Sequence, residues 1–148
     1  MTPKDTAPDI DLETVSRLRL AVMRLARRLR QQADPDITPS MLSALATIER
    51  RGPVSLGALA EAERVRPPTM TEIVRRLENA GFIARSSDPA DKRIALLELS
   101  SEGRRFLDRV RARKNAYLAQ RLRKLDPDDV AALERAVLAI EHLLEEDV

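Results

Sequence analysis

The 148-residue chain is 43% hydrophobic and only 2% aromatic, so its core must be mainly aliphatic, and its 34% of charged residues favours helices. It has no cysteine and one histidine, His142, which excludes disulfides, thiolate zinc sites and a histidine-rich metal site in one chain. The net charge of +2 is unevenly distributed, with +3 in residues 1–33, +6 in residues 34–125 and −7 in residues 126–148. A basic middle beside an acidic end suits a face that meets phosphates, although an uneven solvated surface has the same pattern.

The composition also bears on location and on catalysis. The N-terminal residues lack the apolar core of a signal peptide, and no stretch approaches the length of a membrane span. We therefore expect a soluble, cytoplasmic protein. Neither a phosphate-binding glycine loop nor a convergent set of nucleophile, base and metal ligands is visible, so the sequence predicts no enzyme, no cofactor and no metal site.

The stretch between Asp9 and Asp34 has no proline or glycine and predicts one helix. Its apolar residues recur every three or four positions and form one stripe: Val15, Leu18, Val22, Leu25 and Leu29. A stripe of this kind is typical of a seam between helices, either within one chain or between two chains.

Proline, glycine and capping residues divide the middle of the chain into short elements. The expected order is a helix at residues 39–50, a very short strand at Val54, a helix at residues 56–62 and a helix at residues 67–80. Gly81 is expected to end the last of these helices.

The helix at residues 67–80 has an apolar face, expected to pack on the preceding helices, that consists of Met70, Ile73, Val74 and Leu77. Its other face, with the residue before it, presents Arg66, Pro68, Thr69, Thr71, Glu72, Arg75 and Arg76. Short polar residues followed by arginines suit a helix that enters the major groove of DNA. An ordinary surface helix has the same pattern, but the position between a short helix and a charged hairpin favours DNA binding.

Two strands are predicted next, at residues 82–85 and 93–99, joined by a polar turn. Lys92 and Arg93 at the tip, with Arg85 on the opposing strand, are candidates to reach the minor groove. Asp88 and Asp91 are expected to orient these arginines and to cap the turn. A plain solvated turn is the alternative. Together the elements predict a winged helix-turn-helix.

Two further helices are predicted between Arg104 and Asp126 and from Asp126-Pro127 onward. The last repeats the apolar stripe with Val130, Leu133, Val137, Ile140 and Leu144. We therefore expect a mainly α fold with a small β-wing. Residues 1–33 would form an N-terminal dimerisation helix, residues 34–100 the winged helix-turn-helix and residues 101–148 the C-terminal dimerisation helices. Packing of the stripes within one chain is the alternative, and His142 is expected on the surface or the dimer face.

Residues 66–83 (RPPTMTEIVRRLENAGFI) and the wing segment 88–93 (DPADKR) resemble the MarR family of winged-helix regulators. The wing segment matches the family pattern D-x-x-D-x-R, and residues 99–103 (LSSEG) resemble the family junction between wing and helix. The resemblance extends from about Leu12 to Leu144. The chain departs from the family where Arg66 replaces a common capping serine, Arg64 a common turn glycine and Glu72 a common basic residue.

The resemblance implies a homodimer with interleaved terminal helices, and a repressor of a near-palindromic operator with half-sites about 10 bp apart. It also implies DNA contacts from the outer face of the helix at residues 67–80, and from Arg93 held by Asp91. Glu72 would either read cytosine N4 or reduce nonspecific affinity. Many relatives bind phenolic or lipophilic acids, which makes a small-molecule effector a further candidate partner. The crevice would involve Leu20, Met23 and Arg24, or Met41 and Leu45.

A helical protein–protein interaction module without DNA binding is the alternative function. It would use the apolar stripes to dock another protein and would not depend on Arg75, Arg76 and Arg93. The DNA-binding hypothesis requires these three residues.

Overall fold

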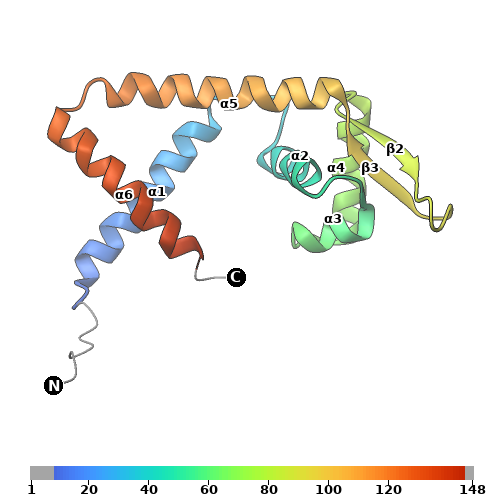
Figure 1. Cartoon of the computed structure of the whole chain (residues 1–148), viewed down its shortest axis with the longest axis horizontal. Helices are drawn as coiled ribbons and strands as arrows, with labels where there is room; N and C mark the ends of the chain where they lie inside the picture. The colour runs from blue at the N-terminus through green and yellow to red at the C-terminus, as the bar shows by residue number, and fades with distance from the viewer. Residues whose placement is uncertain (1–8, 146–148) are drawn as a thin grey trace.

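The structure is a computed structural model that describes residues 9–145 of the chain. The elements in order are α1 (Leu12–Arg30), α2 (Pro39–Arg51), β1 (Val54–Ser55), α3 (Leu56–Ala62), α4 (Pro67–Asn79), β2 (Ile83–Ser87), β3 (Ala95–Leu99), α5 (Ser101–Leu122) and α6 (Pro127–Glu145). In Figure 1 the long helix α5 connects two ends of the molecule, with α2, α3, α4 and the sheet at one end and α1 and α6 at the other. The predicted fold class, mainly α with a small β-wing, is confirmed.

One apolar cluster, here called the winged-helix core, joins α2, α3, α4, the sheet and the first turns of α5. Its most buried large side chains include Leu45, Ile48, Leu59, Met70, Val74, Leu77, Leu97, Phe106, Leu107 and Val110. Met70, Ile73, Val74 and Leu77 face this core, as the sequence predicts. Met41 and Leu45, one of the two residue sets considered for a ligand crevice, are buried here and closed to a ligand.

Side-chain caps fix where these helices begin. The hydroxyls of Thr38, Ser55 and Ser100 accept hydrogen bonds from backbone N–H groups in the first turns of α2, α3 and α5, at 3.3, 3.2 and 3.0 Å. Each cap of this type contributes about 1 kcal/mol. In contrast, Arg66 precedes α4 without a side-chain cap bond, and Pro67 sets the first turn instead.

The three strands form an antiparallel sheet in the order β1-β3-β2. Ile83 lies opposite Leu99, and the pairing continues to Ser87 opposite Ala95. The predicted ends of the strands are wrong by about two residues, because the Asp88 N–H donates to the Ile94 carbonyl at 2.9 Å. This bond closes the wing turn between Ser87, the last residue of β2, and Ala95, the first residue of β3. Residues 92 and 93 therefore lie in the turn and not on a strand.

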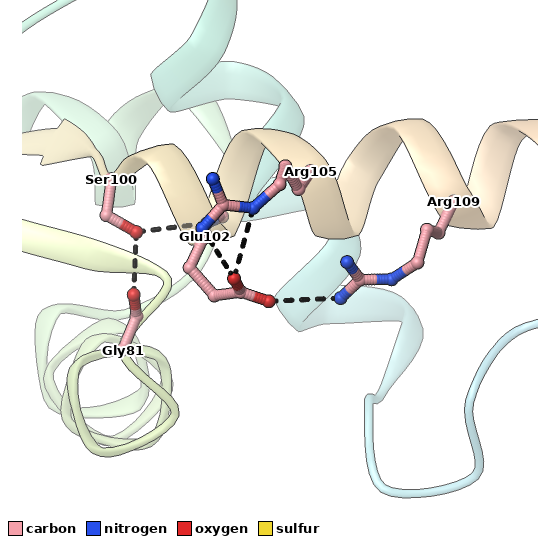
Figure 2. A network of polar contacts seen from close by, with 6 residues as sticks. Gly81, Ser100, Glu102, Arg105 and Arg109 are labelled. Atoms are coloured by element: carbon pink, nitrogen blue, oxygen red, sulfur yellow. Dashed lines mark hydrogen bonds and ion pairs between the residues drawn. The ribbon is translucent and has the colours of Figure 1, made fainter.

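Helix α5 begins at Ser101, three residues before the predicted start, and contains Gly103. A Cβ at Gly103 would lie 2.0 Å from the Phe82 carbonyl oxygen. The Ser100 N–H donates to that oxygen at 3.0 Å, and its hydroxyl donates to the Gly81 carbonyl at 2.6 Å (Figure 2). The Phe82 ring stacks on Phe106 at 4.4 Å. We call these contacts the α4–α5 junction.

Gly103 thus allows a close approach between α5 and the Phe82 carbonyl, and the helix continues through it. Phe106, Leu107 and Val110 of α5 are buried in the winged-helix core. The winged-helix core therefore includes side chains of α5 that lie beyond residue 100.

Helices α1 and α6 contain no buried residue within the described part of the chain. The residues predicted to form the dimer interface are exposed, apart from the half-buried Val130: Val15, Leu18, Val22, Leu133, Val137, Ile140 and Leu144. His142 is also exposed. Among residues 9–145, no helix is both long and apolar enough to cross a membrane.

The α4–α5 junction predicts a large difference between two helical glycines. Gly103→Ala should lower the free energy of unfolding by about 3 kcal/mol, because the new methyl group clashes with a carbonyl oxygen that has little room to move. Gly57→Ala in α3 is the matched control, since a Cβ there meets nothing within 4 Å. Urea unfolding followed by circular dichroism measures both, and equal stability of the two variants would contradict the prediction.

Candidate nucleic-acid interface

The outward face of α4, with the residue before it, carries seven of the ten predicted DNA-binding residues. All of them are exposed: Arg66, Pro68, Thr69, Thr71, Glu72, Arg75 and Arg76. Because four apolar residues of the same helix are buried in the winged-helix core, the rotation of α4 about its axis is fixed. The polar residues are therefore held facing solvent on a rigid element.

Glu72 and Arg75 form a two-bond ion pair on this face. The guanidinium donates through Nη2 to Oε1 at 2.6 Å and through Nε to Oε2 at 2.9 Å. These hydrogen bonds lower the pKa of the Glu72 carboxyl and raise the pKa of Arg75. In the absence of DNA, the Glu72 carboxylate is thus paired with Arg75.

Two other residues on the face also have partners within the chain. The Thr71 hydroxyl donates to the Pro67 carbonyl at 3.0 Å, so its proton is used inside the helix. Arg76 reaches the Asp36 carbonyl at 3.5 Å, in the segment before α2. Arg76 thus lies at the edge of the face nearest α2.

At the wing tip, the Arg93 guanidinium is hydrogen-bonded to the Asp91 carboxylate. Asp91 accepts from the Arg93 backbone N–H at 3.1 Å and from its guanidinium twice at 3.0 Å. The guanidinium bond, followed by the backbone bond, lowers the pKa of the Asp91 carboxyl. The Arg93 side chain is still 90% exposed, and the neighbouring Lys92 is exposed too. Asp88 has a different task, since it accepts from the Ala90 N–H at 2.8 Å and caps the turn.

Arg85 lies away from the tip, opposite Leu97 in the sheet. Its guanidinium forms an ion pair with Glu78 of α4, and this hydrogen bond raises the pKa of Arg85. The charge of Arg85 is therefore balanced by Glu78. The sequence analysis missed Glu78 because the pair joins two different elements. Only the register of the strand against α4 brings the two side chains together.

The first turns of α5 carry a similar ion network. Glu102 accepts from Arg105 at 2.9 Å and from Arg109 at 3.1 Å, on the side of the helix drawn toward the viewer in Figure 2. The arginine bonds lower the pKa of the Glu102 carboxyl. Part of the positive charge of α5 is therefore balanced locally, and the arginines of α4 and the wing tip lie elsewhere on the same end of the molecule.

A small helical domain with a solvent-facing arginine helix and a cationic wing tip is the form of a winged-helix DNA-binding domain. The profile of the MarR family matches residues 37–95, which include α2, α3, α4, β2 and the wing turn up to the first residue of β3. An uncharacterized HTH-type transcriptional regulator of Mycobacterium leprae is 39% identical over 139 residues, covering 93% of this chain and 97% of the relative. The chain belongs to the MarR family.

Two further comparisons agree with this assignment. A transcriptional regulator from Pseudomonas aeruginosa PA01, known from a crystal structure, has a TM-score of 0.81 and 36% identity, covering 93% of this chain and 98% of that one. The HTH-type transcriptional repressor NicR of Pseudomonas putida is 33% identical over 108 residues, covering 72% of this chain and 68% of NicR. This MarR-family protein is thus a DNA-binding transcriptional regulator and not an enzyme.

The Glu72–Arg75 pair predicts that Glu72→Gln raises the affinity for random-sequence DNA by about tenfold. The substitution removes a negative charge from the outward face of α4 and frees Arg75 from its ion pair, so Arg75 would be available to phosphates. The affinity for a selected operator should rise less, so the specificity ratio falls. Fluorescence anisotropy with both duplexes measures this, with Glu134→Gln on α6 as the control. Unchanged binding to random DNA would rule out the holding role of Glu72.

Proposed function

We propose that this MarR-family regulator is a homodimeric repressor that binds a near-palindromic operator in double-stranded DNA, in the cytoplasm. The observation that carries the proposal is the exposed polar face of α4, on which Arg75 lies, beside the wing tip with Arg93. The α4–α5 junction and the winged-helix core hold this helix rigidly, as recognition of base edges requires.

In the proposed complex α4 enters the major groove. Thr69 and Thr71 in its first turns are small enough for close approach, and Arg75 is long enough to reach guanine or a phosphate. Arg93 then lies over the adjacent minor groove, where a narrow groove attracts guanidinium groups. Lys92 at the same turn adds a phosphate contact.

The proposed dimer is supported by the apolar residues that α1 and α6 leave in solvent. Leu133, Val137 and Leu18 are each between 44% and 52% exposed, and contiguous exposed apolar side chains of this kind are typical of an interaction surface. A second copy offers the same stripe with twofold symmetry. Such a dimer presents two copies of α4 to half-sites about 10 bp apart.

The proposed repression rests on the similarity to the repressor NicR. It also rests on the length of DNA that a bound dimer would cover, because a covered operator excludes other proteins. The proposed site for a small-molecule effector is an open hollow of about 440 Å³ on α1, which the second chain would have to close. Leu20 and Met23 form an apolar lining and Arg24 lies beside them, which suits a phenolic or lipophilic acid. An effector there would act where α1 meets the second chain.

The three arginines Arg75, Arg76 and Arg93 provide the direct test of DNA binding. Their simultaneous replacement by alanine should lower operator affinity at 0.1 M salt by roughly a thousandfold or more, since a dimer loses six cationic contacts. The slope of log K against log salt should become shallower by about five. The operator is first obtained by selecting bound genomic fragments, and binding is then measured by mobility shift and anisotropy.

The elution volume and circular dichroism of the triple variant serve as controls, because the dimer and the fold do not need these side chains. A variant that keeps sequence-selective binding would contradict the proposal. A wild-type protein that retards no genomic fragment in a salt-sensitive manner would favour the interaction module without DNA binding.

The dimer interface predicts that Val137→Glu weakens self-association by at least about a hundredfold, since twofold symmetry buries two unpaired carboxylates. Light scattering over a concentration series should then show the 16.6 kDa chain instead of twice that mass. Arg135→Glu places the same carboxylate on the opposite side of α6 and changes the net charge even more, by −2 against −1, so it is a stringent control. Dimers that persist unchanged in Val137→Glu would exclude this face as the interface.

A further inference from the structure

Helix α4 ends with a left-handed residue that satisfies its last carbonyl groups. The Gly81 N–H donates to the Glu78 carbonyl at 2.9 Å, and the Phe82 N–H donates to the Leu77 carbonyl at 3.0 Å. This pair of bonds is the Schellman motif, which needs a positive φ at its central residue. Gly81 has a φ of 75°, and glycine adopts this conformation freely because it has no Cβ.

Helix α3 ends with the same pair of bonds but with a different residue at the centre. The Arg64 N–H donates to the Glu61 carbonyl at 3.1 Å, and the Val65 N–H donates to the Ala60 carbonyl at 3.0 Å. Arg64 has a φ of 53°, the only positive φ of a non-glycine residue in the described part of the chain. For an arginine this conformation is sterically disfavoured, because its Cβ crowds the backbone.

Packing gives no reason for an arginine at this position. Arg64 is exposed, and none of the ion pairs in residues 9–145 involves it. Glycine would fit the turn better, as it does at Gly81. A disfavoured residue that the surrounding structure nevertheless imposes is a marker of function.

The turn that carries Arg64 is fixed to α2. The buried Thr47 hydroxyl donates to Glu63 at 2.6 Å and accepts from Arg50 at 2.9 Å. Glu63 directly precedes Arg64, and α4 begins three residues after Arg64. The backbone at Arg64 is therefore held in place near the N-terminus of α4, the end that enters the groove in the proposed complex.

We infer that Arg64 contacts a DNA phosphate beside the first turn of α4, and that its cationic side chain is the reason the turn lacks a glycine. The inference rests on the proposed DNA binding of this face. It adds a contact on the helix-turn-helix turn itself, next to Arg66, and extends the positive charge from the α4 face to the end of α3. Arg64 thus lowers the stability of the fold and raises the affinity for DNA.

Three variants separate the charge of Arg64 from its backbone conformation. Arg64→Gly removes both the charge and the disfavoured conformation, Arg64→Asn removes the charge and tolerates a positive φ, and Arg64→Lys keeps both. Arg123→Asn, at the end of α5 far from α4 in Figure 1, is the control for loss of one charge. Operator affinity and its salt dependence are measured for each protein on the selected operator. Melting temperatures are measured at one protein concentration, because the melting temperature of a dimer depends on concentration.

Arg64→Gly should raise the melting temperature by about 3 °C, while it lowers operator affinity by about tenfold. Its salt slope should become shallower by about two, one contact for each chain of the dimer. Arg64→Asn should show the same loss of affinity and slope. Arg64→Lys and Arg123→Asn should keep the wild-type slope, and Arg64→Lys should keep the wild-type melting temperature.

Two results would overturn the inference and leave the proposed function standing. One is an unchanged salt slope in Arg64→Gly and Arg64→Asn. The other is an equal loss of affinity in Arg64→Lys, which would assign the effect to the turn and not to its charge. A fall in the melting temperature of Arg64→Gly would overturn the claim that Arg64 lowers the stability of the fold. If the wild-type protein binds no DNA, this inference and the proposed function both fail.

Discussion

The contact between Gly103 and the Phe82 carbonyl sets the position of the functional elements. The Phe82 carbonyl accepts a hydrogen bond from the Ser100 N–H, and the missing side chain of Gly103 lets α5 approach it. Phe82 lies just beyond α4, and Ser100 lies between β3 and α5. One contact therefore holds the recognition helix, the base of the wing and the long helix in a single arrangement.

Helix α5 carries this arrangement to the other end of the molecule. Its 22 residues span roughly 33 Å, and only the first turns lie in the winged-helix core. In the proposed dimer, the pairing of α1 and α6 therefore decides how far apart the two copies of α4 lie. An effector in the α1 hollow would change operator affinity by altering that pairing, with no change within α4 itself.

Local sequence patterns predict most of this fold. Periodic apolar residues identify the inward face of α4, and Thr38 and Ser55 mark the starts of α2 and α3 where the structure places them. The start of α5 was missed because Gly103 serves a contact with Phe82, twenty-one residues earlier in the chain. The Arg85–Glu78 pair was missed for a similar reason, since tertiary packing creates it. The Glu72–Arg75 pair was not predicted either, although its spacing of three residues on a helix could have revealed it.

The arginines of the interface are accompanied by carboxylates, which explains how a nearly neutral chain can bind DNA selectively. The Glu72 and Arg75 side chains remain 57% and 58% exposed, and the Arg93 side chain 90% exposed. Exposed pairs contribute only about 0–1 kcal/mol, so a well-placed phosphate or guanine can take an arginine at small cost. In the proposed complex, DNA that does not fit would leave the arginines with their carboxylates, and the acidic groups would repel its backbone. Local pairing would thus lower nonspecific affinity more than affinity for the operator.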